Sequence, residues 1–170
     1  MERNRLSGTI TTALNAQMTN EAHAAQIYLS YGAWAVSKGY HGIAKFLFKH
    51  SHEERLHMQK LVDYLLDRGA EVEVKEIQAP HKNPENIHKC FEMIFGHEVG
   101  NTKEIYKLVK MCFVEEDWAT WSFMQWFVKE QIEEEALASN LLDRLKIAGG
   151  GAPNGSAIYE LDKDMEKASA

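Results

Sequence analysis

The sequence is poor in the residues that interrupt helices, and it lacks the alternating pattern of strands. Only three prolines occur among 170 residues, and the glycines concentrate between residues 149 and 155. Runs of Val, Ile and Thr at alternate positions are missing, so helix is favoured nearly everywhere. A chain of this length supports one substantial core and is too short to expect two. We therefore predict a single all-α domain over residues 1–170.

Long apolar runs and clusters of positive charge are also missing. No stretch approaches the roughly 20 apolar residues that span a bilayer, and the first residues lack the apolar segment of a signal peptide. Lys and Arg are scattered along the chain and the formal net charge is −6 at pH 7, which argues against a nucleic-acid partner. We expect a cytoplasmic protein with no membrane partner, whose ligands are cations.

Cysteine is scarce, since Cys90 and Cys112 are the only two in the chain. On one helix they would lie about 33 Å apart, which is too far for a disulfide bond. Two reduced thiols fit a reducing compartment and agree with a cytoplasmic location.

What the sequence does contain is four long segments with helical periodicity, separated by chemically marked breaks. The predicted helices span residues 5–36, 41–68, 85–112 and 117–147. The first and last links are tight and force antiparallel neighbours, whereas residues 70–84 can cross the length of a bundle.

A shorter amphipathic helix is predicted over residues 156–168, after a glycine-rich loop. Ile158, Leu161 and Met165 have helical spacing, on a helix too short to be stable alone. Such a tail either caps its own bundle or contacts another subunit. We expect it to serve assembly more than the fold of the bundle.

Each long helix carries one stripe of inward-facing residues, spaced by three and four, with a glutamate at its centre. These glutamates are Glu21, Glu54, Glu98 and Glu134. In each hairpin the two glutamates lie about equally far from the turn, so antiparallel pairing brings them to the same height. His57 follows Glu54 by three residues and shares its helical face.

Buried carboxylates need cations. An ionised carboxylate in an apolar core costs several kcal/mol unless it is paired, and the four stripes carry no Lys or Arg. Two divalent ions would balance four negative charges. Carboxylates and an imidazole suit Fe, Mn or Zn, and four-helix bundles with inward glutamates and a Glu-x-x-His pair hold di-iron centres. Each glutamate taken alone is also compatible with an ordinary hydrated side chain.

These motifs resemble those of the non-haem bacterial ferritins over about residues 5–165. The resemblance rests on the segments LNAQMTNEAHAAQIY, HSHEERLHMQKLVDYL, GHE and QWFVKEQIEEE. It implies a ferritin-like antiparallel four-helix bundle with one long crossover and a short C-terminal fifth helix. It also implies a hollow homo-oligomeric cage of 24 subunits, with the fifth helix at the four-fold axes.

The resemblance further implies a dinuclear iron centre and a third iron site towards the cavity. The first iron would bind Glu21, Glu54 and His57. The second would share Glu54 as a bridge and bind Glu98 and Glu134, with Gln131 alongside. The ligands of the third iron would be Glu53, Glu130, Glu133 and the shared Glu134. Tyr28, about 10 Å along the helix from Glu21, would act beside the centre as an electron donor.

Three more side chains near these residues have weaker signals. His23 stands where the family often has a bulky residue, and we interpret it as a surface histidine rather than an extra ligand. His50, one turn before Glu54, is interpreted as a structural hydrogen-bonding residue. For Trp126, about 12 Å from Glu134 along the helix, core packing accounts for the residue at least as well as electron donation.

The implied activity is that of a ferroxidase, which oxidises Fe(II) to Fe(III) with dioxygen or peroxide and deposits ferric mineral for iron storage and detoxification. No haem is expected. Arg55 occupies the position after the bridging glutamate where bacterioferritins have a haem-ligating methionine, and arginine has no lone pair to donate. A rubrerythrin-like peroxidase would need paired cysteines, which the chain lacks. The non-enzymatic alternative is a helical scaffold whose acidic core residues are hydrated.

Overall fold

A computed structural model describes residues 4–149 and 155–168, and within this part of the chain it forms helices and no strand. The helices are α1 (Gly8–Ser37), α2 (His41–Asp67), α3 (Ile87–Val114), α4 (Trp118–Gly149) and α5 (Gly155–Ala168). Every predicted helix is present, with its ends within three residues of the predicted positions. The predicted all-α class is therefore confirmed.

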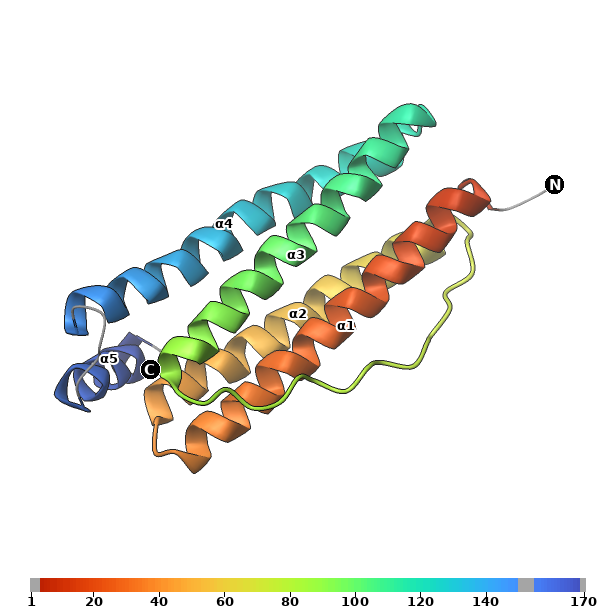
Figure 1. Cartoon of the computed structure of the whole chain (residues 1–170). Coiled ribbons are helices and arrows are strands. Elements are labelled where there is room, and N and C mark those ends of the chain that lie inside the picture. Colours follow the sequence, from red (N-terminus) through yellow and green to blue (C-terminus); the bar gives the residue numbers. More distant parts are fainter. Residues whose placement is uncertain (1–3, 150–154, 169–170) are drawn as a thin grey trace.

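The four long helices form two antiparallel hairpins, α1 with α2 and α3 with α4 (Figure 1). The crossover from α2 to α3 runs along the bundle beside α1, so α2 and α3 point in the same direction (Figure 1). Buried Asn15 of α1 holds the start of the crossover, because its amide donates to the carbonyl of Glu71 (3.0 Å) and accepts from the N–H of Glu73 (2.7 Å). This is the predicted four-helix bundle with one long connection.

Local chemistry explains where the helices begin and end. The Ser7 hydroxyl accepts a hydrogen bond from the Ile10 N–H (3.1 Å) at the start of α1, and Asn86 caps α3 in the same way through Lys89 (2.8 Å). Gly39 (φ 84°) follows α1 in the left-handed conformation that favours glycine. The tight hairpin turn follows from this geometry.

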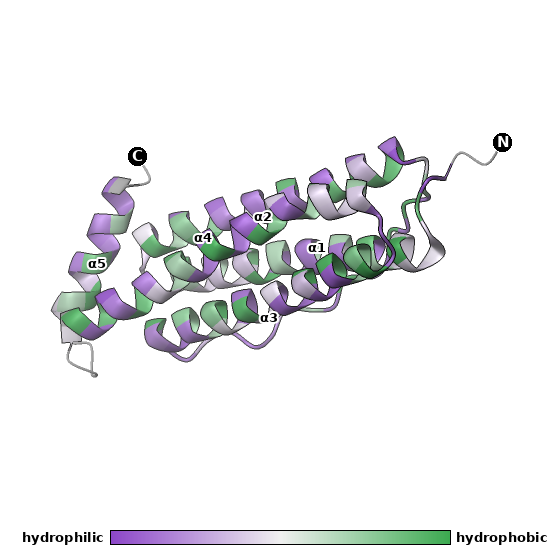
Figure 2. Ribbon diagram, turned by 90° about the horizontal axis from the view of Figure 1, so that it is seen from above, coloured by the Kyte–Doolittle hydropathy of each residue, from purple (hydrophilic) through white to green (hydrophobic). Residues whose placement is uncertain are grey.

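The apolar core has two parts, one towards each end of the bundle. The part nearer α5 includes Ile27, Tyr31, Leu47, Phe91 and Leu141. The other part includes Leu14, Leu61, Ile105, Leu108 and Phe127. Hydrophobic and hydrophilic residues alternate along every long helix in Figure 2, as expected for helices with one buried face. A polar layer separates the two apolar parts.

Helix α5 lies across one end of the bundle and packs against α2 and α4 (Figures 1 and 2). Its residues Leu161 and Met165 are both 5% exposed and belong to the nearer apolar cluster. The Asp162 carboxylate accepts a hydrogen bond from the Ile43 N–H (2.9 Å), at a helix start that has no side-chain cap of its own. A side chain at Gly42 would collide with the backbone of Asp162. Within the subunit the tail therefore caps its own bundle, and its role in assembly stays a prediction.

Within residues 4–149 and 155–168, none of the helices combines the length and the apolar character that crossing a membrane requires.

Candidate metal centre

The polar layer between the two apolar clusters receives side chains from all four long helices. Its central members are almost completely buried, with exposed fractions of 7% or less: Glu21, Glu54, His57, Glu98, Gln131 and Glu134. The helical periodicity carries each of them inwards, and the antiparallel pairing places them at one height. The structure thus brings together the side chains that the sequence singled out.

The most compact part of the layer lies between α1 and α2. Glu21, Glu54 and His57 each offer one ligand atom, and these three atoms lie within 4.8 Å of one another. One oxygen of Glu21 and one of Glu54 are buried and have no hydrogen-bond partner among residues 4–149 and 155–168. Buried carboxylate oxygens without partners are costly, and a cation would satisfy them.

The other half of the layer lies between α3 and α4. The Tyr28 hydroxyl donates to Glu98 Oε1 (2.7 Å), and the Gln131 amide lies 3.4 Å from Glu98 Oε2. Gln131 also donates to the Thr102 hydroxyl (3.2 Å). Glu98 is therefore oriented by neutral donors, which leave its charge uncompensated. Glu98 and Glu134 lie outside the compact three-residue group formed within the described chain.

The buried carboxylates of the two halves of the layer influence one another's pKa values. Burial raises the pKa of Glu21, Glu54 and Glu98 above the usual range, and the neighbouring carboxylates raise them further. Burial, and then the charge of Glu98, raises the pKa of Glu134 to about 8. Within the described residues, no Lys or Arg forms an ion pair with these four side chains. The layer therefore has a strong affinity for positive charge, in the form of protons or metal ions.

Two further polar residues, Gln17 and Asn101, complete the layer and were not among the predicted site residues. Gln17 donates through Nε2 to Glu21 Oε1 (2.6 Å) and to Asn101 Oδ1 (2.7 Å). Both lie on the inward stripes about one turn from Glu21 and Glu98. This position on the inward stripes could have identified both residues from the sequence, because an amide on a buried stripe needs a buried partner.

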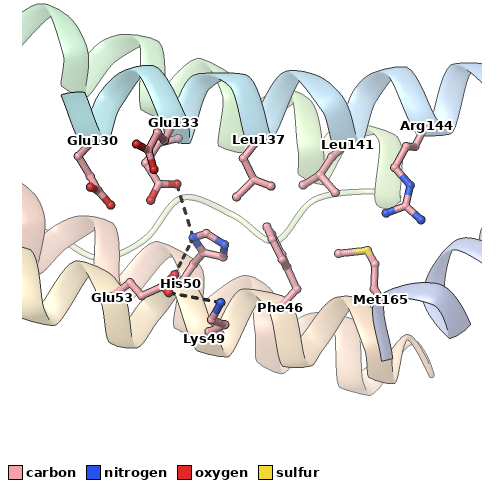
Figure 3. A pocket seen from close by; sticks show the side chains of 11 residues that line it. Phe46, Lys49, His50, Glu53, Glu130, Glu133, Leu137, Leu141, Arg144 and Met165 are labelled. Carbon is pink, nitrogen blue, oxygen red and sulfur yellow. Dashed lines mark ion pairs between the residues drawn. The ribbon is translucent and has the colours of Figure 1, made fainter. Parts of the chain in front are cut away.

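A cavity of about 420 Å³ opens beside the layer, between α2 and α4 (Figure 3). Glu130 and Glu133 of α4 extend towards Glu53 of α2, and Glu134 lines the same cavity. Glu130 Oε1 also lies 3.6 Å from His57 Nε2, so this cluster adjoins the compact group. The four carboxylates that the resemblance implies for a third metal ion therefore share one pocket.

His50 lies inside this pocket. Its Nδ1 is 3.3 Å from Glu53 Oε2 and 3.6 Å from Glu134 Oε2 (Figure 3). Burial lowers the pKa of His50 to about 4, so the ring is neutral at pH 7. Nδ1 has no hydrogen-bond partner in the described part of the chain, so a structural hydrogen-bonding role for His50 stays a prediction.

The two aromatic residues near the layer differ in their surroundings. Tyr28 is 2% exposed and contacts Glu98 directly through its hydroxyl. Trp126 is 37% exposed, and its ring meets His57 edge to face at 5.3 Å between centroids. Lys60 covers the Trp126 ring, with Nζ 4.5 Å from the centroid. Trp126 therefore packs against a member of the layer at the surface, outside both core clusters.

A four-helix bundle with a central layer of carboxylates and one Glu-x-x-His pair defines a protein of the class that holds carboxylate-bound metal ions. Comparisons with known proteins specify the family. Residues 11–148 match the family model of the ferritin-like domain. The bacterial non-heme ferritin of Campylobacter jejuni is 36% identical over 158 residues, covering 93% of each chain. A probable bacterial non-heme ferritin-like protein of Haemophilus influenzae is 37% identical over 160 residues, covering 94% of this chain and 95% of that protein.

Solved structures agree with this assignment. The open-pore ferritin of the hyperthermophilic archaeon Archaeoglobus fulgidus superposes with a TM-score of 0.90 at 34% identity, covering 95% of this chain and 98% of that chain. The chain belongs to the ferritin family, as its motifs predicted.

Proposed function

We propose that this protein stores and detoxifies iron, as a ferroxidase that oxidises Fe(II) to Fe(III) with dioxygen or peroxide. Each Fe(II) gives up one electron, and the oxidant accepts a pair of electrons from two ions in one site. The ferric product is deposited as mineral inside a cage of 24 subunits. The names of its relatives, bacterial non-heme ferritins, support the proposal.

The observation that carries this proposal is the buried layer of four carboxylates and one imidazole. In its fully ionised form the layer is stable in a core only with cations, and its oxygen-rich donor set suits Fe(II). Two Fe(II) ions would balance the four carboxylates. We assign Glu21 and His57 to one ion and Glu98 and Glu134 to the other, with Glu54 as the bridge.

Two neighbours have supporting roles in this proposal. Gln131, beside Glu98, orients the carboxylates of the second ion. Tyr28 is bonded to Glu98 and has an oxidisable ring at the edge of the centre, so we assign it the role of an additional electron donor. The pocket formed by Glu53, Glu130, Glu133 and Glu134 would hold a third iron ion on the path of the product.

Exposed apolar side chains on the bundle support the proposal that subunits, each forming one ferritin-like domain, assemble into a cage. Large apolar side chains are exposed around the turn between α3 and α4: Phe113 (59%), Val114 (70%) and Trp118 (55%). Exposed apolar groups of this size mark subunit contacts in soluble proteins. Cys90 and Cys112 are buried free thiols, which suits the proposed cytoplasmic location.

The test compares Glu54, the proposed bridge of the dinuclear centre, with Glu130, a proposed ligand of the third ion in the adjoining pocket. Glu54→Ala should abolish the rapid oxidation of two Fe(II) per subunit, because it removes the bridge and leaves the remaining charges poorly neutralised. Glu130→Ala should keep that first phase and alter later steps, such as the ratio of iron oxidised to oxygen consumed. Stopped-flow absorbance after aerobic addition of Fe(II) measures both.

Circular dichroism and sizing of each variant serve as controls for folding and assembly. If Glu130→Ala stops the first phase as completely as Glu54→Ala, the division between the centre and the third site is wrong. If the unmodified protein leaves iron to oxidise at the rate of buffer alone, the chain is the helical scaffold with hydrated acidic residues instead.

A further inference from the structure

Three histidines meet on the outside of α1 and α3, beneath the crossover. His23 belongs to α1, His81 to the crossover and His97 to α3. The ring centroid of His23 lies 6.4 Å from that of His81 and 6.4 Å from that of His97, with interplanar angles of 72° and 81°. Segments that are distant in the sequence thus bring three imidazoles together.

Two of these rings have nitrogen atoms that the fold leaves unsatisfied. Nε2 of His23 and Nε2 of His97 are buried, and neither has a hydrogen-bond partner anywhere in residues 4–149 or 155–168. A buried polar atom without a partner is destabilising, so native proteins rarely tolerate two in one cluster without a ligand. The third ring, that of His81, is exposed and gives the cluster access to solvent.

We propose that His23, His81 and His97 bind one divalent transition-metal ion of the Zn²⁺ type, at a site separate from the iron centre. Imidazole nitrogen suits Zn²⁺, Cu²⁺ and Ni²⁺, whereas sites rich in carboxylate oxygen suit harder ions. Three neutral imidazoles add no negative charge, so this site differs in selectivity from the carboxylate layer. Three protein ligands leave a fourth position for water.

The three rings must move closer together to share one ion. Imidazoles that share a zinc ion at Zn–N distances of about 2.1 Å have ring centroids roughly 5 to 6 Å apart. The separations of 6.4 Å from His23 to each of the other two rings exceed this by about 0.4 to 1.4 Å, and the nitrogen atoms of the three rings do not all lie within 4.8 Å of one another. His81 lies on an irregular segment that can supply this movement, while α1 and α3 hold the other two rings.

The site is distinct from the iron centre although two of its residues are close to that centre in sequence. His97 precedes Glu98, and successive residues of a helix point about 100° apart. His23 follows Glu21 by two residues and is likewise turned away from the buried stripe. A metal ion held by the three histidines would fasten the crossover to α1 and α3 from the outside.

The test uses Zn²⁺ alone and one pair of matched variants. His81→Ala removes the exposed ligand with little risk to folding, and His88→Ala removes an exposed histidine of α3 outside the cluster. Crystals of the full-length protein soaked in Zn²⁺ should show an anomalous peak among the three rings in the unmodified protein and in His88→Ala. The peak should be missing in His81→Ala.

Calorimetric titration provides the solution readout, because all three proteins share the same carboxylate layer. His81→Ala should bind one fewer Zn²⁺ per subunit than the unmodified protein, and His88→Ala should bind the same number. A saturated crystal without a peak at the three rings would overturn the proposal. So would equal stoichiometry in His81→Ala and the unmodified protein, since any peak would then reflect binding at crystal concentration only.

Discussion

Glu134→Gln should stabilise the metal-free protein, and the gain should grow as the pH rises. Glu134 is 7% exposed, and burial together with the charge of Glu98 raises its pKa to about 8, against 4.5 for an unperturbed glutamate. Between these two values the folded protein retains a proton that the unfolded chain releases. The contribution of this carboxyl to stability is therefore intact below about pH 4.5 and is lost as the pH rises towards 8. Glutamine stays neutral throughout and avoids the loss.

The size of the effect follows from the pKa difference. One pKa unit corresponds to about 1.4 kcal/mol, so a shift from 4.5 to about 8 corresponds to roughly 5 kcal/mol in the free energy of unfolding at high pH. Between pH 5 and pH 8 the advantage of Glu134→Gln over the unmodified protein should increase by about 3 kcal/mol. For a chain of this length that corresponds to roughly 6 to 12 °C in Tm.

Scanning calorimetry of the metal-free proteins at several pH values between 5 and 8 measures this difference. The comparison between variants matters, because burial also lowers the pKa of His50 to about 4 and adds a pH dependence of opposite sign. Subtracting Glu134→Gln from the unmodified protein removes the part of that contribution that does not depend on Glu134, although His50 Nδ1 lies 3.6 Å from Glu134 Oε2. Glu133→Gln is the matched control, since Glu133 is an exposed neighbour on the same helix.

A constant Tm difference between Glu134→Gln and the unmodified protein from pH 5 to pH 8 would refute the reasoning. The same holds if Glu133→Gln reproduces the full effect, because the cause would then be net charge rather than burial. A second readout is the rise in Tm on adding Mn²⁺, which does not oxidise under these conditions. This rise should be smaller in Glu134→Gln, because a metal ion has one fewer carboxylate to neutralise.

Two other predictions concern α5 and haem. Asp162→Ala should destabilise the subunit by about 1 kcal/mol, because it removes the side chain that caps the start of α2. Asp164→Ala, at an exposed position, should have little effect. Thermal unfolding of the two variants measures this difference, and equal losses of stability would argue against the cap. Purified protein should show no Soret band, because Arg55 cannot ligate haem iron; a Soret band that persists on purification and is lost in Met58→Ala would contradict this.

The central glutamates could be predicted from the sequence because their positions depend on short-range geometry. Spacing by three and four determines which helix face is buried, and the distance from each turn determines height along the bundle. Glu21 and Glu54 could therefore be paired from the sequence alone. The helix ends were equally predictable, since caps such as Ser7 and Asn86 act within one turn.

Contacts between segments that no regular repeat connects could not be predicted in this way. The hydrogen bond from Gln17 to Asn101 depends on how α1 and α3 face each other across the bundle. In the sequence, Asp162 is one of several polar residues of an amphipathic tail. Only the docking of α5 places it over the start of α2. Neither distance along the chain nor residue type contains that information.

The sequence by itself determined the helices, their buried faces and the height of the carboxylate layer, because all three follow from the period of the α-helix and the length of the links. Only the tertiary structure decided which side chains meet across those helices. It placed His50 between Glu53 and Glu134, and it brought His81 on the crossover to His23. An irregular segment has no period, so the neighbours of its residues depend on its packing against α1 and α3.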